Sequence, residues 1–98
     1  MMNIGQTIRD LRIKKEIKQK DLALKSGIKP TYLSQIEKGQ KTPTLDVLER
    51  ISKALDIPMP ILTFLSLSED DINPDKRDSY KRIEPAIKGL IREFFLSP

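Results

Sequence analysis

Hydrogen-bonding side chains are concentrated in one short segment, GIKPTYLSQIEKG, which runs from Gly27 to Gly39. Hydroxyl, amide and ammonium groups come from Lys29, Thr31, Tyr32, Ser34 and Gln35. Leu33 and Ile36 are spaced to share one face of a helix. A short helix with this pattern buries little of itself and leaves donors and acceptors on its other face. Such a face suits recognition by hydrogen bonding.

Catalytic chemistry has little support in the sequence. The chain has no His and no Cys, which removes thiolate nucleophiles, the usual zinc ligands and the commonest general acid/base. Ser34 and Lys38 lie one helical turn apart, as in a serine–lysine pair, but no strained turn presents the serine. No glycine-rich phosphate loop is present. We therefore expect no enzyme activity, no cofactor and no bound metal.

The positive charge is unevenly distributed along the 98 residues. The net charge is +4, yet residues 1–41 carry ten Lys or Arg against four Asp or Glu. Residues 67–98 carry six basic residues against seven acidic ones. The first part therefore has the electrostatics of a nucleic-acid binder, although a solvated basic surface is the alternative. No signal peptide or membrane span is evident, so we expect a cytoplasmic protein without membrane contact.

Helical periodicity accounts for the first two-thirds of the chain. The apolar spacing predicts helices over about 4–15, 19–26, 30–38 and 45–55, and a fifth that opens at Pro58-Met59-Pro60. Gly27 suits a left-handed position after the second helix. No segment shows the alternation of a half-buried strand. The fold class expected is all-α, with residues 1–66 as one domain.

The remainder is predicted to be an acidic linker, 67–78, followed by a C-terminal amphipathic helix within 79–98. The apolar stripe of that helix consists of Tyr80, Ile83, Ile87, Leu90, Ile91, Phe94 and Phe95. Pro85 is expected to break or kink the helix, so that its main part runs from about 85 to 96.

Two short helices joined by a glycine turn, the second polar at its start, describe a helix-turn-helix. The segment QKDLALKSGIKPTYLSQIEKGQKTPTLDVLERISKALDI closely resembles the Cro/repressor-type (Xre-like) helix-turn-helix family, over about residues 4–65. The resemblance is carried by Gln19, Leu22-Ala23, Gly27, the Ser34-Gln35-Ile36-Glu37-x-Gly39 run, Pro43, and Leu45 to Leu55. It implies a five-helix, lambda-repressor-like domain that binds double-stranded DNA, with the second helix of the motif in the major groove.

The resemblance also implies roles for individual residues. Gln19 matches a position that hydrogen-bonds a phosphate. Thr31, Tyr32 and Gln35 match groove-facing positions of the recognition helix. The Gln35 amide can pair with adenine N6 and N7; the alternative is an ordinary exposed glutamine. The Tyr32 ring either packs on a sugar or thymine methyl or covers the edge of the core.

Several basic residues surround this helix. Lys29 stands where the family usually has a capping Ser or Thr, so either the cost is tolerated or Lys29 reaches a phosphate. Pro30 replaces a polar residue that often reads a base. Lys38 and Lys41, with main-chain N–H groups near Gln40 and Thr42, are candidates to hold the DNA backbone. For each lysine a solvated surface charge is the alternative.

Arg12 and Glu37 match a pair that forms a salt bridge between the first helix and the end of the third. Both are therefore interpreted as structural. Losing one partner of a partly buried pair costs up to about 3–5 kcal/mol.

Three interpretations of the C-terminal stripe remain open. It pairs with a second copy to form a homodimer, folds back onto helices of its own chain, or binds a different protein such as a toxin. The function expected is a sequence-specific transcriptional regulator, a repressor, that binds an inverted-repeat operator as a homodimer through helix 30–38. The alternative is an antitoxin-like or adaptor protein whose main role is to bind a protein partner.

Overall fold

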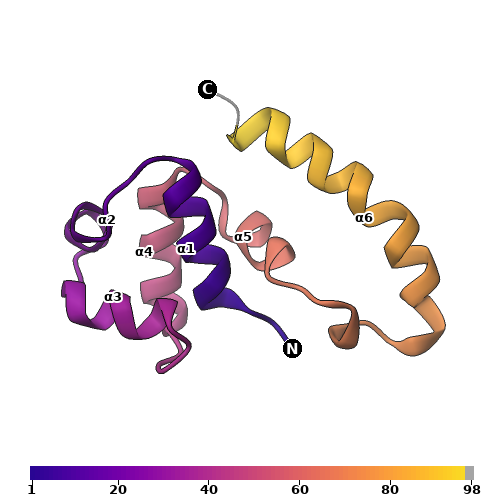
Figure 1. Cartoon of the computed structure of the whole chain (residues 1–98), viewed down its shortest axis with the longest axis horizontal. Helices are drawn as coiled ribbons and strands as arrows, with labels where there is room; N and C mark the ends of the chain where they lie inside the picture. Colours follow the sequence, from indigo (N-terminus) through magenta and orange to yellow (C-terminus); the bar gives the residue numbers. More distant parts are fainter. Residues whose placement is uncertain (97–98) are drawn as a thin grey trace.

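The computed structural model of the chain describes residues 1–96, which form helices and connecting turns without a strand (Figure 1). The all-α prediction is confirmed. The first five helices are α1 (Ile4–Lys14), α2 (Gln19–Ser26), α3 (Pro30–Glu37), α4 (Leu45–Leu55) and α5 (Met59–Leu65). None of the helices in the described range is long and apolar enough to cross a membrane.

The helix ends follow from local sequence. Gly27 adopts a left-handed φ of 68° directly after α2, where a side chain would be strained. Gly39 does the same, with φ 77°, in the turn after α3. Thr44 caps α4, because its hydroxyl oxygen accepts a hydrogen bond from the Val47 N–H at 3.2 Å.

One apolar core joins the five helices. Its buried residues are Ile8, Leu11, Leu22, Ala23, Leu33, Ile36, Val47, Leu48, Ile51, Leu55, Ile57 and Leu62. Within this unit α2 packs against α4, and α1 packs against both α3 and α5. Gly5 permits the approach of α1 to α3, because a Cβ there would lie 2.0 Å from the carbonyl oxygen of Ile36.

The acidic segment after α5 is ordered by local hydrogen bonds. It contains two 3-10 helices, Glu69–Asp71 and Pro74–Lys76. Ser68 and Asp71 form a reciprocal capping box on the first of them. The hydrogen bond from the Ser68 N–H lowers the pKa of the Asp71 carboxyl. Arg77 Nε donates to the carbonyl oxygens of Glu69 and Ile72, at 2.9 and 3.0 Å, which joins this segment to the next helix.

The final helix, α6 (Arg77–Ile91), runs through Pro85. The expectation that Pro85 would break it, with the main helix beginning near residue 85, was wrong. Proline removes the N–H that would donate to Lys81, but both residues are exposed, so water can satisfy that carbonyl. The Lys88–Glu84 pair, at 3.1 Å, also supports the helix at this point. A π-helical turn, Arg92–Leu96, follows α6. Ser97 and Pro98 of the expected C-terminal segment lie outside the described residues.

The apolar stripe of this region divides into two sets. Ile91 is only 4% exposed, and Phe95, with Leu96, packs against the five-helix core. Ile83, Leu90 and Phe94 remain 54%, 55% and 75% exposed. Figure 1 shows α6 apart from the five-helix unit for most of its length and returning toward it at its C-terminal end. Part of the stripe therefore completes the chain's own packing, and part faces solvent.

The remaining stripe residues, Tyr80 and Ile87, are half-buried. Burial raises the pKa of the Tyr80 hydroxyl, and the nearby Glu84 carboxylate acts in the same direction.

Candidate nucleic-acid interface

The conformation of the turn between α2 and α3 is determined by the end of α2 and by the start of α3. After Gly27, the Ile28 N–H donates to the carbonyl of Ala23 at 3.0 Å, which closes the end of α2. Lys29 is extended, as expected for a residue that precedes proline. Pro30 then occupies the first turn of α3, where its missing N–H is no loss. The Lys29 side chain makes no capping hydrogen bond.

Arg50 on α4 braces the same turn. Its Nη1 donates to the carbonyl oxygens of Ser26 and Gly27, at 3.1 and 3.3 Å. Asp46, one turn earlier on α4, holds Arg50 Nη2 at 3.1 Å. The Arg50 guanidinium thus satisfies carbonyls at the C-terminal end of α2, where positive charge is also favoured by the helix dipole.

The α3 helix has one buried and one polar face. Leu33 and Ile36 are 0% and 1% exposed. Thr31 is exposed, and Tyr32 and Gln35 are half-buried. Tyr32 also packs against the core. Within residues 1–96 no hydrogen bond engages the side chains of these three, so their polar groups are available to an external partner.

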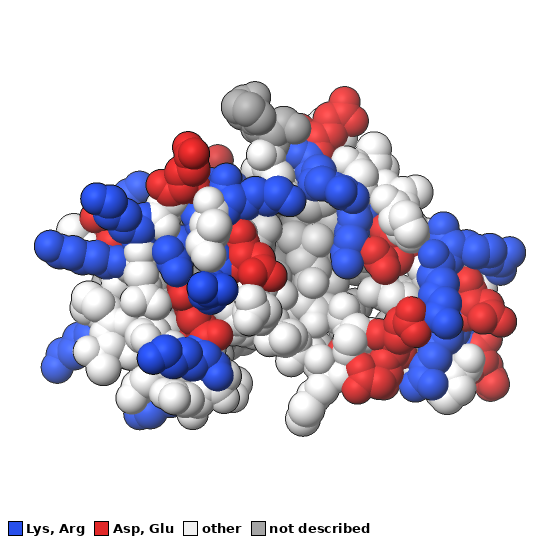
Figure 2. Space-filling view, viewed as in Figure 1, with Lys and Arg blue, Asp and Glu red and all other residues white. Residues whose placement is uncertain are grey.

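Exposed lysines lie beside this polar face, but main-chain N–H groups in the turn after α3 are already hydrogen-bonded within the protein. Lys29, Lys38 and Lys41 are all exposed, and Figure 2 shows basic side chains distributed over this part of the surface. The N–H groups of Gln40 and Lys41 both donate to the carbonyl of Gln35, at 2.8 and 3.2 Å. The expectation that main-chain N–H groups would be offered here is therefore wrong for these two residues.

A buried ionic network holds the end of α3. Arg12 on α1 binds Glu37 through Nε to Oε2 at 2.8 Å and through Nη2 to Oε1 at 3.0 Å. The Glu37 side chain is 2% exposed and that of Arg12 is 12% exposed. Arg12 Nη1 also donates to the carbonyl of Ile17, at 3.0 Å. This two-pronged geometry fixes the position of α3 relative to α1.

Gln19, the expected phosphate contact, belongs to the same network. Its Nε2 donates to Glu37 Oε1 at 3.1 Å. One amide hydrogen is thereby committed within the protein, which leaves the second hydrogen and the main-chain N–H at the first position of α2 for a phosphate.

Sequence reasoning missed Arg50 and Gly5 as residues that position the recognition helix. The sequence around Arg50 indicates only a pair with Asp46, which lies four residues earlier on α4. Gly5 follows directly after the start of α1, where a glycine indicates a close approach of another backbone. The partner of neither residue could be read from spacing.

Comparison with known proteins agrees with this geometry. The profile of the helix-turn-helix family matches residues 8–62. The chain is 38% identical over 65 residues to the control protein C.BamHI of Bacillus amyloliquefaciens, covering 64% of this chain and 80% of that protein. It is 30% identical over 101 residues to the immunity repressor of Bacillus phage phi105, covering 98% of this chain and 70% of the repressor.

A solved structure has the same arrangement of helices. The restriction-modification controller protein C.AhdI of Aeromonas hydrophila matches with a TM-score of 0.60 and 34% identity, covering 62% of this chain and 92% of that one. The chain spans only 41% of an uncharacterised HTH-type transcriptional regulator of Mycobacterium tuberculosis, to which it is 40% identical over 58 residues. The match of the profile over more than half of the chain, with the turn at Gly27 and the polar face of α3, identifies the chain as a member of the Xre-like helix-turn-helix family.

Proposed function

We propose that this chain is a sequence-specific DNA-binding transcriptional regulator whose α3 helix enters the major groove. One observation carries the proposal: α3 buries Leu33 and Ile36 completely, while the side chains of Thr31, Tyr32 and Gln35 make no hydrogen bond within residues 1–96. A helix held this firmly, with unused polar groups along one side, suits insertion into a groove lined by base edges.

Within this proposal, Gln35 reads a base and Thr31 and Tyr32 contact neighbouring bases or sugars. Lys29, Lys38 and Lys41 bind phosphates, and their exposure supports that role. Gln19, at the start of α2, donates its remaining hydrogen bonds to a DNA phosphate. The replacement of a polar residue by Pro30 leaves base recognition to fewer side chains.

Repression is the favoured direction of regulation. The immunity repressor of phage phi105 aligns with nearly the whole chain. Such a repressor would act by occupying its operator, and DNA binding of this kind implies a cytoplasmic location.

We further propose that the chain binds an inverted repeat as a homodimer. Ile83, Leu90 and Phe94 remain exposed, whereas Ile91 is buried and Phe95 is half-buried, and the three exposed residues follow one side of the C-terminal helical segment. A second copy would cover this side. Relatives of this motif read half-sites about 34 Å apart, one helical turn of DNA.

Selection of bound duplexes from a random pool, read by sequencing, tests the proposal. The expected result is an inverted repeat with half-sites about one turn apart, together with a steep loss of affinity as salt rises. Enrichment of no motif, with only weak salt-sensitive binding, would contradict sequence-specific recognition. The exposed side of α6 would then favour the second candidate, an adaptor or antitoxin-like protein that binds a protein partner.

A further inference from the structure

One side of α6 and of the turn that follows it is exposed along its whole length and is mostly apolar. We name this side the outer stripe, and its exposed residues are Ile83, Ala86, Leu90 and Phe94. They are spaced three or four residues apart, so they share one face of a helix. Gly89, beside the stripe, is also exposed, and a Cβ there would meet no atom within 4 Å. The small Ala86 and Gly89 therefore leave the middle of the stripe open to close approach by another helix.

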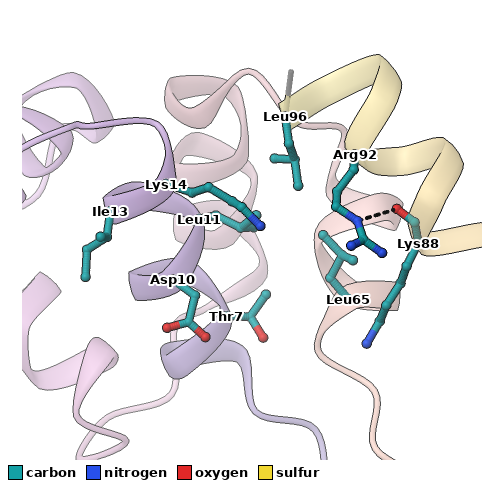
Figure 3. Close-up of a pocket in the computed structure, with 9 residues that line it drawn as sticks. All are labelled: Thr7, Asp10, Leu11, Ile13, Lys14, Leu65, Lys88, Arg92 and Leu96. Carbon is teal, nitrogen blue, oxygen red and sulfur yellow. Dashed lines mark hydrogen bonds between the residues drawn. The ribbon is translucent and has the colours of Figure 1, made fainter. Parts of the chain in front are cut away.

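The opposite side of this segment is turned toward the chain's own five-helix unit. Ile91 is buried there. Figure 3 shows the side chains of Lys88 and Leu96 directed into the space between this segment and α1. Lys88 is also paired with Glu84 at 3.1 Å. The inner side thus has partners within its own chain, and the outer stripe is the side left for a second molecule.

Two opposite charges lie beside the outer stripe on the same flank. Arg82 and Glu93 are 11 positions apart, close to three turns of helix, so they stand on one flank at opposite ends of the stripe. Both residues are exposed. Arg82 Nη2 donates to Ser79 Oγ at 3.4 Å, a weak hydrogen bond, and within residues 1–96 neither charged side chain forms an ion pair. Both charges are therefore available to a partner.

The position of these charges distinguishes between two ways of pairing the helix with a second copy. In an antiparallel helix pair each flank meets the same flank of its partner, so Arg82 would lie against Glu93 of the partner subunit, and the contact would occur twice by symmetry. In a parallel pair this flank would meet the partner's opposite flank, and equal residues would lie at equal height. Arg82 would then face no acidic residue. Charge complementarity therefore favours the antiparallel pair.

The same ion pairs bring the apolar residues of the two stripes into register. When Arg82 lies level with Glu93 of the partner subunit, the midpoint of the contact falls between positions 87 and 88. Leu90 of each copy then lies at a height between Ile83 and Ala86 of the other. The large side chains of the two stripes alternate along the contact, as in knobs-into-holes packing.

We infer that two copies of this chain associate through their outer stripes as an antiparallel pair of α6 helices, held in register by two ion pairs between Arg82 and Glu93. This inference rests on the homodimer proposed above and adds the orientation of its subunits. The two-fold axis passes near Ala86 and Gly89. It also relates the two α3 helices, as recognition of an inverted repeat requires.

Cross-linking through single introduced cysteines tests the orientation in the full chain, which has no Cys of its own. In the inferred pair the two copies of position 86 lie about 5 Å apart along the helix axis, whereas the two copies of position 79 lie about 25 Å apart. A short bismaleimide should therefore link Ala86→Cys into a covalent dimer and should link Ser79→Cys at least tenfold less. A parallel pair would be linked at both positions.

Charge exchange tests the register. Arg82→Glu and Glu93→Arg should each raise the dissociation constant of the dimer about two- to tenfold in sedimentation experiments, because each dimer contains two exposed ion pairs. The combined variant Arg82→Glu with Glu93→Arg should restore the value of the parent chain. Thermal melts of all variants should match the parent, which excludes loss of folding as the cause.

The possible results separate this inference from the proposals on which it rests. Equal cross-linking of the two cysteine variants, or no recovery in the combined charge variant, would overturn the antiparallel pair and leave the homodimer standing. A parent chain that sediments as a monomer over the whole concentration range would overturn both the homodimer and this inference. Selection of bound duplexes would still decide whether the chain recognises a DNA sequence.

Discussion

The guanidinium of Arg12 donates hydrogen bonds to both carboxylate oxygens of Glu37, at 2.8 and 3.0 Å. This pair connects α1 to the C-terminal end of α3. Glu37 also accepts from Gln19 at 3.1 Å. A single buried carboxylate therefore links α1, α2 and α3. The orientation of the polar face of α3 depends on this network, although none of its three members lies on that face.

Arg12→Ala should lower the free energy of unfolding by about 3–5 kcal/mol, because the nearly buried Glu37 would lose its charged partner. DNA binding should weaken chiefly through this loss of stability. Urea denaturation, compared with that of Arg9→Ala on the exposed side of α1, measures the effect. Unchanged melting combined with lost DNA binding would instead make Arg12 a contact residue.

Gly5→Ala should destabilise the chain by about 3 kcal/mol, because the new methyl group would lie 2.0 Å from the Ile36 carbonyl oxygen and would force α1 away from α3. Gly89→Ala is the matched control. It is also helical but has no atom within 4 Å of the added Cβ, so it should stabilise by about 0.5–1 kcal/mol. Thermal melts that move in the same direction for both variants would contradict this account.

The first five helices were predictable because their signals are local. Leu45 to Leu55 repeats with helical spacing, Thr44 can cap, and Gly27 and Gly39 permit left-handed turns. These choices depend on neighbours within a few residues. The predicted ends of α2 and α4 accordingly coincide with those in the structure.

The C-terminal region was less predictable because its contacts are long-range. The stripe from Tyr80 to Phe95 has one periodicity, yet Ile91 is buried while Leu90 and Phe94 are exposed. Sequence spacing indicates an apolar face but not which neighbour covers each part of it. The Pro85 expectation failed for a related reason, since the cost of proline depends on whether the orphaned carbonyl can reach water.

Part of the candidate DNA interface was predictable from the sequence, and part required the long-range contacts of the folded chain. The register of Thr31, Tyr32 and Gln35 followed from the family motif. The commitment of Gln19 to Glu37, and of the Gln40 and Lys41 N–H groups to Gln35, required the folded chain.

Gln35→Ala should relax the base preference at one position of each half-site by about 1–3 kcal/mol, the discrimination expected from a two-pronged amide contact. Binding of the selected operator and of its single-base variants measures this change. Gln40→Ala removes an exposed amide from the following turn and should leave the preference intact. A uniform loss of affinity for all sequences would assign Gln35 to the phosphate backbone instead.

Arg50→Ala should destabilise the chain by about 1–2 kcal/mol and weaken operator binding beyond that loss, because the Ser26 and Gly27 carbonyls would lose their donor. Lys53→Ala breaks an exposed pair with Glu49 on the same helix and should cost less than about 0.5 kcal/mol. The comparison is made by urea denaturation and by DNA titration at a temperature where both variants are fully folded. Equal effects of the two substitutions would show that the brace on the α2–α3 turn is unimportant.

Ile83→Asp combined with Leu90→Asp should convert a homodimer into a folded monomer, because both side chains are more than half exposed and a charge there would oppose burial against a second copy. Sedimentation gives the mass, and thermal melting at equal chain concentration separates the loss of association from the loss of folding. Ile91→Asp, a neighbouring substitution at a residue only 4% exposed, should lower the melting temperature even of the monomer, because it places a carboxylate where the chain packs on itself. If the parent chain already sediments as a monomer at micromolar concentration, the exposed side of α6 is not a stable self-association surface, and operator binding must occur without preformed dimers.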